Sequence, residues 1–336
     1  MRSRRTRRSA WCSRGACREG AQQLIRLGRI DHVCLRVRDL DEAAARWALQ
    51  FGLVERSREA GRALLACNDE PYSLELVESV EPPGFDHVAF ELHRRCSLDD
   101  AREHLAAAGV PADEHDGALW PTDPDGRRIE LLPYREPREE TERWSQHARP
   151  SSTVHLGGPR RLGHVNCLTG AIRENMAFYR DVLGMSVSDW LGDGGVWLRI
   201  DSEHHVLALV DRGYAHFHHL AFDVVDIGKM RDLLDHVARH GRWVSWGPTR
   251  HGIAGNIATY VRITEEPCHV ELYCDMERLE EDHVPRVYPD DRYSSNTWGP
   301  LPPRSYFRFD PVAVEWESES RETLGEPLPP AETTAR

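Results

Sequence analysis

The stretch LGHVNCL (residues 162–168) repeats the pattern of an earlier stretch, IDHVCLRV (residues 30–37), and each places a histidine among alternating apolar residues. A second histidine follows 55 residues later in both copies, and a glutamate in the sequence IELL or VELY follows that. The two sets are His32, His87 and Glu130 in the first half, and His164, His219 and Glu271 in the second. The chain is therefore a tandem repeat that carries the same His-His-Glu pattern twice.

The two copies differ between the second histidine and the glutamate, which lie 43 residues apart in the first half and 52 in the second. The extra residues fall in a stretch that contains His251 and Tyr260. His205 lies fourteen residues before His219, and the matching position of the first half is Ser73. We therefore expect the chemistry in the second half, and we interpret the first set as vestigial or structural.

Composition excludes several classes of function. The chain has 336 residues, 29% of them charged and 40% hydrophobic, which is ordinary for a globular protein with room for two domains. The net charge of −12 argues against a nucleic-acid partner. No apolar run approaches the length of a membrane span. Eight cysteines without CxxC spacing predict reduced thiols and a cytoplasmic protein.

The charge and proline distribution divides the chain into segments. The first residues are rich in arginine and lack an apolar core, so an extension is expected there, although a transit peptide or twin-arginine signal is an alternative. The acidic, proline-rich C-terminal tail is expected to be disordered. The predicted segments are a disordered extension (1–27), a non-catalytic N-terminal domain (28–135), a linker (136–160), a catalytic C-terminal domain (161–275), a lid segment (276–312) and a disordered tail (313–336).

Each half reads as two similar units of one strand, one helix and further short strands, which predicts an α+β fold with mainly antiparallel strands. In the first unit, Asp39 is a predicted N-cap for a helix that Gly52 ends. The second half has a comparable helix in RENMAFYRDVLG (residues 173–184).

Two histidines and one carboxylate are the ligands of the facial triad that is typical of non-haem Fe(II) oxygen chemistry, although the same donors also bind Mn(II), Zn(II) or Ni(II). In a strand over HHLAFDV, His219 shares a face with the small Ala221, while His218 lies on the bulky apolar face. Glu271 at mid-strand between apolar neighbours is costly unless it is paired or binds a metal. Each residue alone has a structural explanation, but their recurrence in two repeats favours a metal site.

With these residues in place, the chain resembles the type I extradiol ring-cleaving dioxygenases of the vicinal oxygen chelate superfamily. The resemblance extends from about Gly28 to Phe309. It is strongest over LGHVN, AFYRDVLGM, HHVLAL, HHLAFDV, GPTRHG and HVELY. It implies four βαβββ modules paired into two tandem domains, each a curled mixed sheet around a cleft. It also implies a homo-oligomer of the tetramer type.

The resemblance assigns roles to individual residues. His164, His219 and Glu271 match the ligands of an Fe(II) ion, occasionally Mn(II). His205 matches the acid–base histidine, and an imidazole that titrates near neutrality suits that task. His251 and Tyr260 match groups that hydrogen-bond the substrate. Asn166 matches a pocket asparagine of the homoprotocatechuate-cleaving branch.

One departure concerns the substrate. Arylacetate-cleaving relatives have an arginine five residues before the position of His251, where this chain has Trp246. A carboxylated substrate is therefore not expected, although Arg250 lies nearby. The segment YPDDRYSSNTWGPLPPRSYF (residues 288–307) resembles the lid of that branch, and Arg292 or Trp298 is expected to close the pocket.

The sequence therefore predicts a dioxygenase that cleaves a catechol-type ring beside its diol with both atoms of O2. Two alternatives stay open. A glyoxalase-like isomerase that uses Zn(II) or Ni(II) explains the triad, but it gives His205, His251 and Tyr260 no joint purpose. A ligand-sequestering protein of the same fold needs no metal, so a complete triad argues against it.

Overall fold

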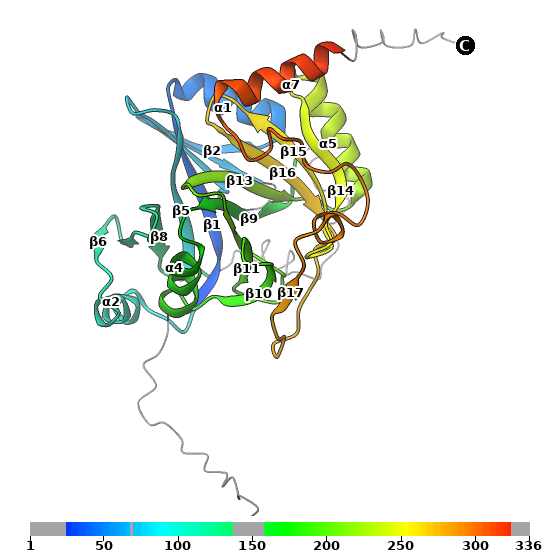
Figure 1. The fold of residues 1–336 in the computed structure, drawn as a ribbon. Coiled ribbons are helices and arrows are strands. Elements are labelled where there is room, and N and C mark those ends of the chain that lie inside the picture. The colour runs from blue at the N-terminus through cyan, green and yellow to red at the C-terminus, as the bar shows by residue number, and fades with distance from the viewer. Residues whose placement is uncertain (1–24, 68–69, 137–157, 324–336) are drawn as a thin grey trace, which may run out of the picture.

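The computed structural model describes residues 25–67, 70–136 and 158–323, with the side chains of the last few residues of the C-terminal helix left out. Two mixed sheets dominate this part of the chain, one in each half (Figure 1). The first has eight strands in the order β2-β3-β4-β1-β5-β8-β7-β6, and the second has nine in the order β14-β15-β16-β13-β9-β12-β11-β10-β17. The expectations of an α+β fold and of two tandem domains are confirmed.

Each sheet contains two βαβββ modules. Those of the first half are β1 (Leu27–Val37), α1 (Leu40–Phe51), β2 (Val54–Glu59), β3 (Arg62–Ala66) and β4 (Leu74–Glu78), then β5 (Gly84–Leu92), α2 (Leu98–Ala107), β6 (Ala112–His115), β7 (Ala118–Pro121) and β8 (Arg128–Leu132). Those of the second half are β9 (Arg161–Thr169), α4 (Ile172–Ala177), η1 (Phe178–Val182), β10 (Ser186–Leu191), β11 (Gly195–Arg199) and β12 (Leu207–Asp211), then β13 (His216–Asp223), α5 (Ile227–Arg239), β14 (Val244–Arg250), β15 (Ile257–Ile263) and β16 (Cys268–Cys274).

The first and last strands of each module pair in parallel, while the first strands of the two modules pair antiparallel at the centre of the sheet. The predicted histidines therefore lie on neighbouring central strands, and each glutamate lies on the strand next to the second histidine. Because both halves share this strand arrangement, the equal spacing of the two histidines follows from the fold.

The helix ends follow the local sequence. The Asp39 side chain accepts a hydrogen bond from the Glu42 amide at the start of α1, and Gly52 ends the helix in the left-handed conformation with φ of 68°. Both expectations are confirmed. The single helix expected over residues 173–184 is instead α4 followed by the π-helical turn η1. There the Tyr179 hydroxyl donates to Asp123 of the first half, a contact that the sequence pattern does not reveal.

The C-terminal part differs from expectation in one respect. After β16 the chain runs through β17 (Arg286–Tyr288), which extends the second sheet beside β10, and α6 (Arg292–Ser295). It then forms α7 (Pro311–Thr323), so the prediction of a disordered tail from residue 313 is wrong for the start of that segment (Figure 1). Asp310 caps α7 by accepting from the amides of its first turn, and Glu317 anchors it to Arg262 on β15.

The start of β1 overlaps the expected N-terminal extension. β1 begins at Leu27, one residue inside the expected extension, and Ile25 is already buried. The rest of that extension and most of the linker lie outside the described residues. The six cysteines within the described ranges are free and buried, as core thiols. Across those ranges, no helix has the length and apolar character needed to span a membrane.

A buried ion pair joins the two domains. Nη2 of Arg46 on α1 lies 2.7 Å from Oε1 of Glu266, and the Trp47 indole donates to the other carboxylate oxygen over 3.2 Å. Glu266 is only 2% exposed. Removing Glu266 takes the one buried carboxylate from the Arg46 guanidinium and leaves it with the exposed Glu42 and Glu265.

We expect Glu266→Gln to lower the free energy of unfolding by about 3 kcal/mol, measured by urea denaturation. The matched control is Glu265→Gln, because the Glu265 carboxylate is 39% exposed and belongs to the same loop. Its loss is expected to cost less than about 1 kcal/mol. Equal effects of the two substitutions would show that the buried pair does not stabilise the domain interface.

Candidate metal centre and its cavity

His164, His219 and Glu271 converge at the centre of the second sheet. The strand register places Ala221 of β13 opposite His164 on β9 and beside Glu271 on β16. Because alanine is small, the ring and the carboxylate can meet above it. Nε2 of His164 and Nε2 of His219 lie 3.1 Å and 3.0 Å from the same Glu271 oxygen, Oε2. All three residues are at most 3% exposed.

The hydrogen bonds around His219 fix its tautomer. The backbone carbonyl of Tyr306 can only accept, so Nε2–H of His218 donates to it over 3.0 Å. Nδ1 of His218 must then accept from Nδ1–H of His219, 2.8 Å away. Nε2 of His219 is left with a lone pair that faces a carboxylate oxygen. Two acceptors at this distance repel each other unless a cation lies between them, so the donor set fits a metal ion.

The expectation that His218 packs on the apolar face of β13 is wrong. The pairing of β13 with β9 shifts register between Phe217 and His219, so strict alternation is lost at His218. The His218 ring is fully buried and stacks on His269 with a centroid separation of 5.0 Å. A β-bulge thus turns a predicted core residue into the group that orients a ligand.

Glu271 is held as an anion that points one oxygen at the histidines. Asn256 donates to Oε1 over 3.1 Å, which leaves Oε2 facing the two rings. Burial opposes the charge of the carboxylate, but the imidazole of His164 holds the pKa of Glu271 well below its usual range. Asn256 lies between His251 and Tyr260, in the stretch where the second half is longer, and it was not among the predicted site residues.

Gly163 is required by the packing behind the metal ligands. A Cβ at this position would lie 1.8 Å from the Tyr273 hydroxyl, whose ring lies 4.8 Å from that of His164. The glycine before His164 therefore lets Tyr273 support the ligand ring. Larger residues at position 163 would displace one of the two rings.

His205 has an orienting chain of the same kind as His219. Nε2–H of His204 donates to the Asp189 carboxylate over 2.8 Å, so Nδ1 of His204 accepts from Nδ1–H of His205 over 3.1 Å. Nε2 of His205 is therefore free to accept a proton. The His205 ring lies 4.3 Å from that of His164, and burial holds the pKa of His205 well below its usual value. Each HH dipeptide of the sequence thus pairs one functional ring with one orienting ring.

His251 and Tyr260 meet on the far side of His219. Nδ1–H of His251 donates to the Ser295 carbonyl over 3.1 Å, so its Nε2 accepts from the Tyr260 hydroxyl over 2.9 Å. The Trp246 ring stacks on Tyr260 with a centroid separation of 4.9 Å, and its indole donates to the carbonyl of Pro300 in the lid segment. The lid therefore docks on the aromatic residues that border the site.

These side chains surround one cavity of about 180 Å³. The predicted residues that line it are His164, His219, Glu271, His205, His251, Tyr260, Asn166 and Trp246. Oδ1 of Asn166 is buried without a hydrogen-bond partner, as expected for a group that awaits a ligand.

Three of the expected pocket residues do not line the cavity. Arg250 pairs with Asp275 over 3.2 Å, because a register shift of β14 between Trp246 and Thr249 puts it on the face opposite to Trp246. Arg292 is exposed and bonds to its neighbour Tyr293, and Trp298 is 44% exposed while its carbonyl accepts from Thr249. The lid contributes other groups instead. Several further residues line the cavity and were not predicted from the sequence. They include Trp197, Ala208, Arg212, Asp290, Tyr306 and Phe307.

Comparison with protein families agrees with this geometry. The model of the glyoxalase/bleomycin resistance protein/dioxygenase superfamily matches residues 29–131 and again residues 161–272. The chain belongs to this superfamily. Among curated relatives, it is 28% identical over 302 residues to metapyrocatechase 2 of Cupriavidus necator, covering 83% of this chain and 91% of that protein. It is 24% identical to metapyrocatechase of Geobacillus stearothermophilus, over 71% and 79% of the two chains.

Solved structures of the superfamily share the fold. Homoprotocatechuate 2,3-dioxygenase of Arthrobacter globiformis aligns with a TM-score of 0.73 at 18% identity, covering 86% of this chain and 93% of that one. A Mn(II)-bound glyoxalase of Novosphingobium aromaticivorans aligns with a TM-score of 0.70 at 24% identity, covering 84% and 94%. At these identities the structures establish the architecture alone.

Proposed function

We propose that this superfamily member cleaves a catechol-type aromatic diol beside its hydroxyl groups and inserts both atoms of O2, which gives a ring-opened semialdehyde. The observation that carries the proposal is that His205, His251 and Tyr260 border the same cavity as the His-His-Glu set. Metal binding alone does not need these three groups, whereas ring cleavage requires proton transfer and stabilisation of a phenolate. The metapyrocatechases among the relatives support the same reaction.

The proposed cofactor is Fe(II), with Mn(II) as the alternative, held by His164, His219 and Glu271. When bound, such an ion supplies adjacent coordination positions for the diol and O2 and lets electrons pass between them. The single carboxylate and the two neutral imidazoles leave the remaining positions open. The open side of the set faces the cavity.

His205 is the proposed acid–base residue. Its free Nε2 takes a proton from a substrate hydroxyl and returns a proton during ring opening. The chain through His204 to Asp189 keeps Nδ1 protonated and the ring in place. Asp189 is in this view a positioning residue, because it acts through the two histidines.

His251 and Tyr260 are proposed to stabilise the substrate oxygen. The Tyr260 hydroxyl lies at the edge of the cavity, and when its proton turns from His251 it can donate to a phenolate. Burial raises the pKa of Tyr260 well above its usual value, so this hydroxyl keeps its proton. The unpaired Oδ1 of Asn166 is available to a substrate hydroxyl or to a water molecule.

The aromatic residues that line the cavity predict which ring substituents the substrate carries. Trp246 and Tyr306 border the inner cavity, and Arg212 at the exposed rim is the one guanidinium among the cavity residues within the described part of the chain. We expect kcat/KM for catechol or an alkylcatechol to exceed that for 3,4-dihydroxyphenylacetate by at least roughly 10-fold, since a buried carboxylate without a charged donor is costly. The reverse preference would identify Arg212 as a carboxylate-binding residue.

The second candidate is a glyoxalase-like isomerase, a class that the matched superfamily also includes. Loading the protein with Fe(II) without oxygen and then adding a catechol panel distinguishes the two. Dioxygenase activity requires O2 uptake together with yellow ring-opened products. Isomerase activity would proceed equally under argon, and unchanged catechols in the presence of O2 would refute the proposal.

We further propose a cytoplasmic homo-oligomer of the tetramer type. The resemblance to extradiol dioxygenases supports the assembly, and the reduced, buried cysteines are compatible with a reducing compartment. Light scattering of the purified protein tests the assembly.

A further inference from the structure

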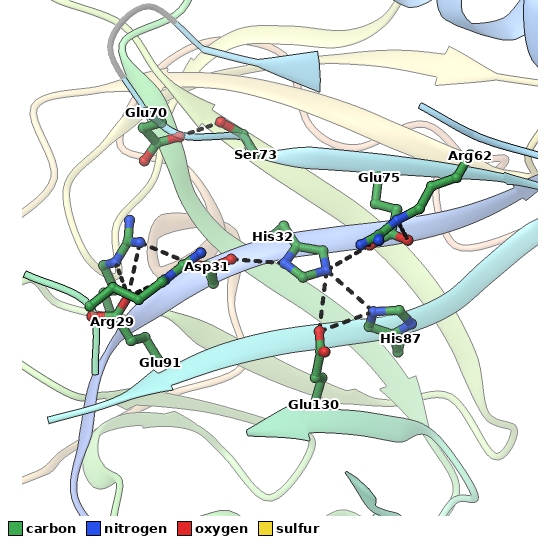
Figure 2. A network of polar contacts seen from close by, with 11 residues as sticks. Arg29, Asp31, His32, Arg62, Glu70, Ser73, Glu75, His87, Glu91 and Glu130 are labelled. Atoms are coloured by element: carbon green, nitrogen blue, oxygen red, sulfur yellow. Dashed lines mark hydrogen bonds and ion pairs between the residues drawn. The ribbon is translucent and has the colours of Figure 1, made fainter. Parts of the chain in front are cut away.

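The His-His-Glu set of the first half also converges on one point. Nε2 of His32 on β1 lies 3.3 Å from Nε2 of His87 on β5, and Oε2 of Glu130 on β8 lies 3.4 Å and 3.5 Å from these two atoms (Figure 2). Atoms bound about 2.1 Å from one ion lie roughly 3.0–3.4 Å apart at octahedral and tetrahedral angles. The observed spacing is therefore that of ligands around a shared metal ion.

A fourth group joins this set. Oε2 of Glu75 on β4 lies 3.1 Å from Nε2 of His32, and one Glu75 oxygen lies within 4.8 Å of one ring nitrogen of His87. Arg62 pairs with both Glu75 oxygens, at 2.6 Å to Oε1 and 3.1 Å to Oε2, and so fixes the carboxylate beside His32 (Figure 2). Both glutamates and both histidines are at most 8% exposed. A second buried carboxylate therefore lies next to the His32–His87–Glu130 set, on the side of His32.

The hydrogen bonds behind the rings prepare both histidines as ligands. Nδ1–H of His32 donates to Asp31 over 2.9 Å, and Nδ1–H of His87 donates to Asp86 over 2.9 Å. These carboxylates leave an Nε2 lone pair on each ring, and the two lone pairs face each other. Histidine ligands of metal sites characteristically donate their other nitrogen to a carboxylate in this way. The first-half set is thus oriented at least as well as that of the second half, where Nδ1 of His164 has no partner.

A proton on His32 does not account for the arrangement as well as a metal ion. Nε2 of His32 has three acceptor atoms within 3.1–3.4 Å, from Glu75, His87 and Glu130. One N–H points at one acceptor, so the others would repel each other in a buried place. Among the described residues, Glu130 forms ion pairs with the two histidines alone. A cation of higher charge among His32, His87 and Glu130 satisfies these three groups, with Glu75 beside His32.

The comparison with the second half indicates what this ion would do. Val33 pairs with Leu74 as Val165 pairs with Leu207, so Glu75 occupies the place of Ala208. Ala208 lines the substrate cavity of the second half, whereas the first half has a fourth ligand there. The Tyr72 ring packs against His32 at 4.7 Å and the Trp120 ring against His87 at 4.8 Å. The first-half set therefore has an added carboxylate where the second has space for a diol.

We propose that His32, His87, Glu75 and Glu130 form a second metal site, which holds one divalent first-row transition-metal ion without taking part in ring cleavage. This proposal replaces our interpretation of the first set as vestigial. It rests on the N-terminal geometry alone and is independent of the proposed dioxygenase function.

The test is the number of Co(II) ions that the metal-free protein binds in equilibrium dialysis. The wild-type chain is expected to bind two equivalents, and the substitutions Glu75→Gln and Glu130→Gln are each expected to remove one. Glu78→Gln is the matched control, because Glu78 is exposed at the end of the same strand β4, and it should retain both. One equivalent in the wild type, or two equivalents retained in both variants, would overturn the proposal.

Thermal unfolding tests the N-terminal site separately from the second-half site. In a Glu271→Ala background, which removes the second-half ligand, Co(II) should still raise the unfolding temperature, because an ion that binds only the folded state stabilises it. Adding Glu130→Gln to that background should abolish the rise. A rise that persists in the double variant would place the ion elsewhere and refute the assignment.

Discussion

Glu271→Ala should abolish catechol cleavage and remove the metal ion of the second half. Glu271 is the one carboxylate of that set, and its Oε2 faces both histidines at 3.0–3.1 Å. Without it, two neutral imidazoles remain in a buried place. We expect the loss of metal affinity to exceed the roughly 10–100-fold that follows removal of a group that only orients a ligand.

The measurement is metal content after loading with Fe(II), followed by the rate of O2 uptake with catechol. Asn256→Ala is the graded comparison, because Asn256 orients Oε1 of Glu271 without reaching the ion. It is expected to weaken metal binding by about 10–100-fold. If Glu271→Ala kept full metal content and full activity, the second-half set would not be the catalytic centre.

His205→Ala should leave metal and catechol binding in place but lower kcat by about 100- to 10,000-fold, the usual contribution of a general acid–base group. The reason is geometric, since Nε2 of His205 is the free end of the chain that begins at Asp189. Single-turnover kinetics with Fe(II)-loaded protein measure the chemical step directly. Spectral titration with catechol under argon measures binding separately.

Asp189→Asn provides the companion variant. If Asp189 acts through His204 and His205, its loss should lower kcat less than the loss of His205 and leave KM nearly unchanged. If His205→Ala turned over at the wild-type rate, His205 would have no role in proton transfer and the cavity would need another base.

The repeat was sufficient to predict the architecture. Equal spacing of the two histidines required equivalent strands in both halves, and the small Ala221 beside His219 predicted which face of β13 is open. Asp39 and Gly52 predicted the two ends of α1, because capping depends on neighbours within a few residues. Features that rest on local chemistry or on fixed sequence intervals could therefore be read from one chain.

Contacts between distant segments could not be read in this way. The position of His218 depends on a β-bulge, and that of α7 on the pairing of Glu317 with Arg262, 55 residues earlier. Composition alone predicted disorder for the segment of α7, although Asp310 and Pro311 are residues that commonly start a helix. The lid residues that reach the cavity, Tyr306 and Phe307, likewise depend on the path of a long loop.

The fourth ligand of the first half shows the same limit. In the sequence Ser73 matches the position of His205, whereas the sheet register places Glu75 beside His32. Strand pairing determines which residue reaches the cluster, and a single-residue shift changes the face of every side chain.

The account is tested most directly by an anomalous-difference map from crystals loaded with Fe(II) and soaked with catechol without oxygen. We predict a peak within coordination distance of His164, His219 and Glu271, with both diol oxygens in contact with it and His205 beside one of them. A second peak among His32, His87 and their two glutamates would bear only on the N-terminal site. A map in which the three second-half ligands hold no metal, or in which catechol binds away from it, would contradict the central claim.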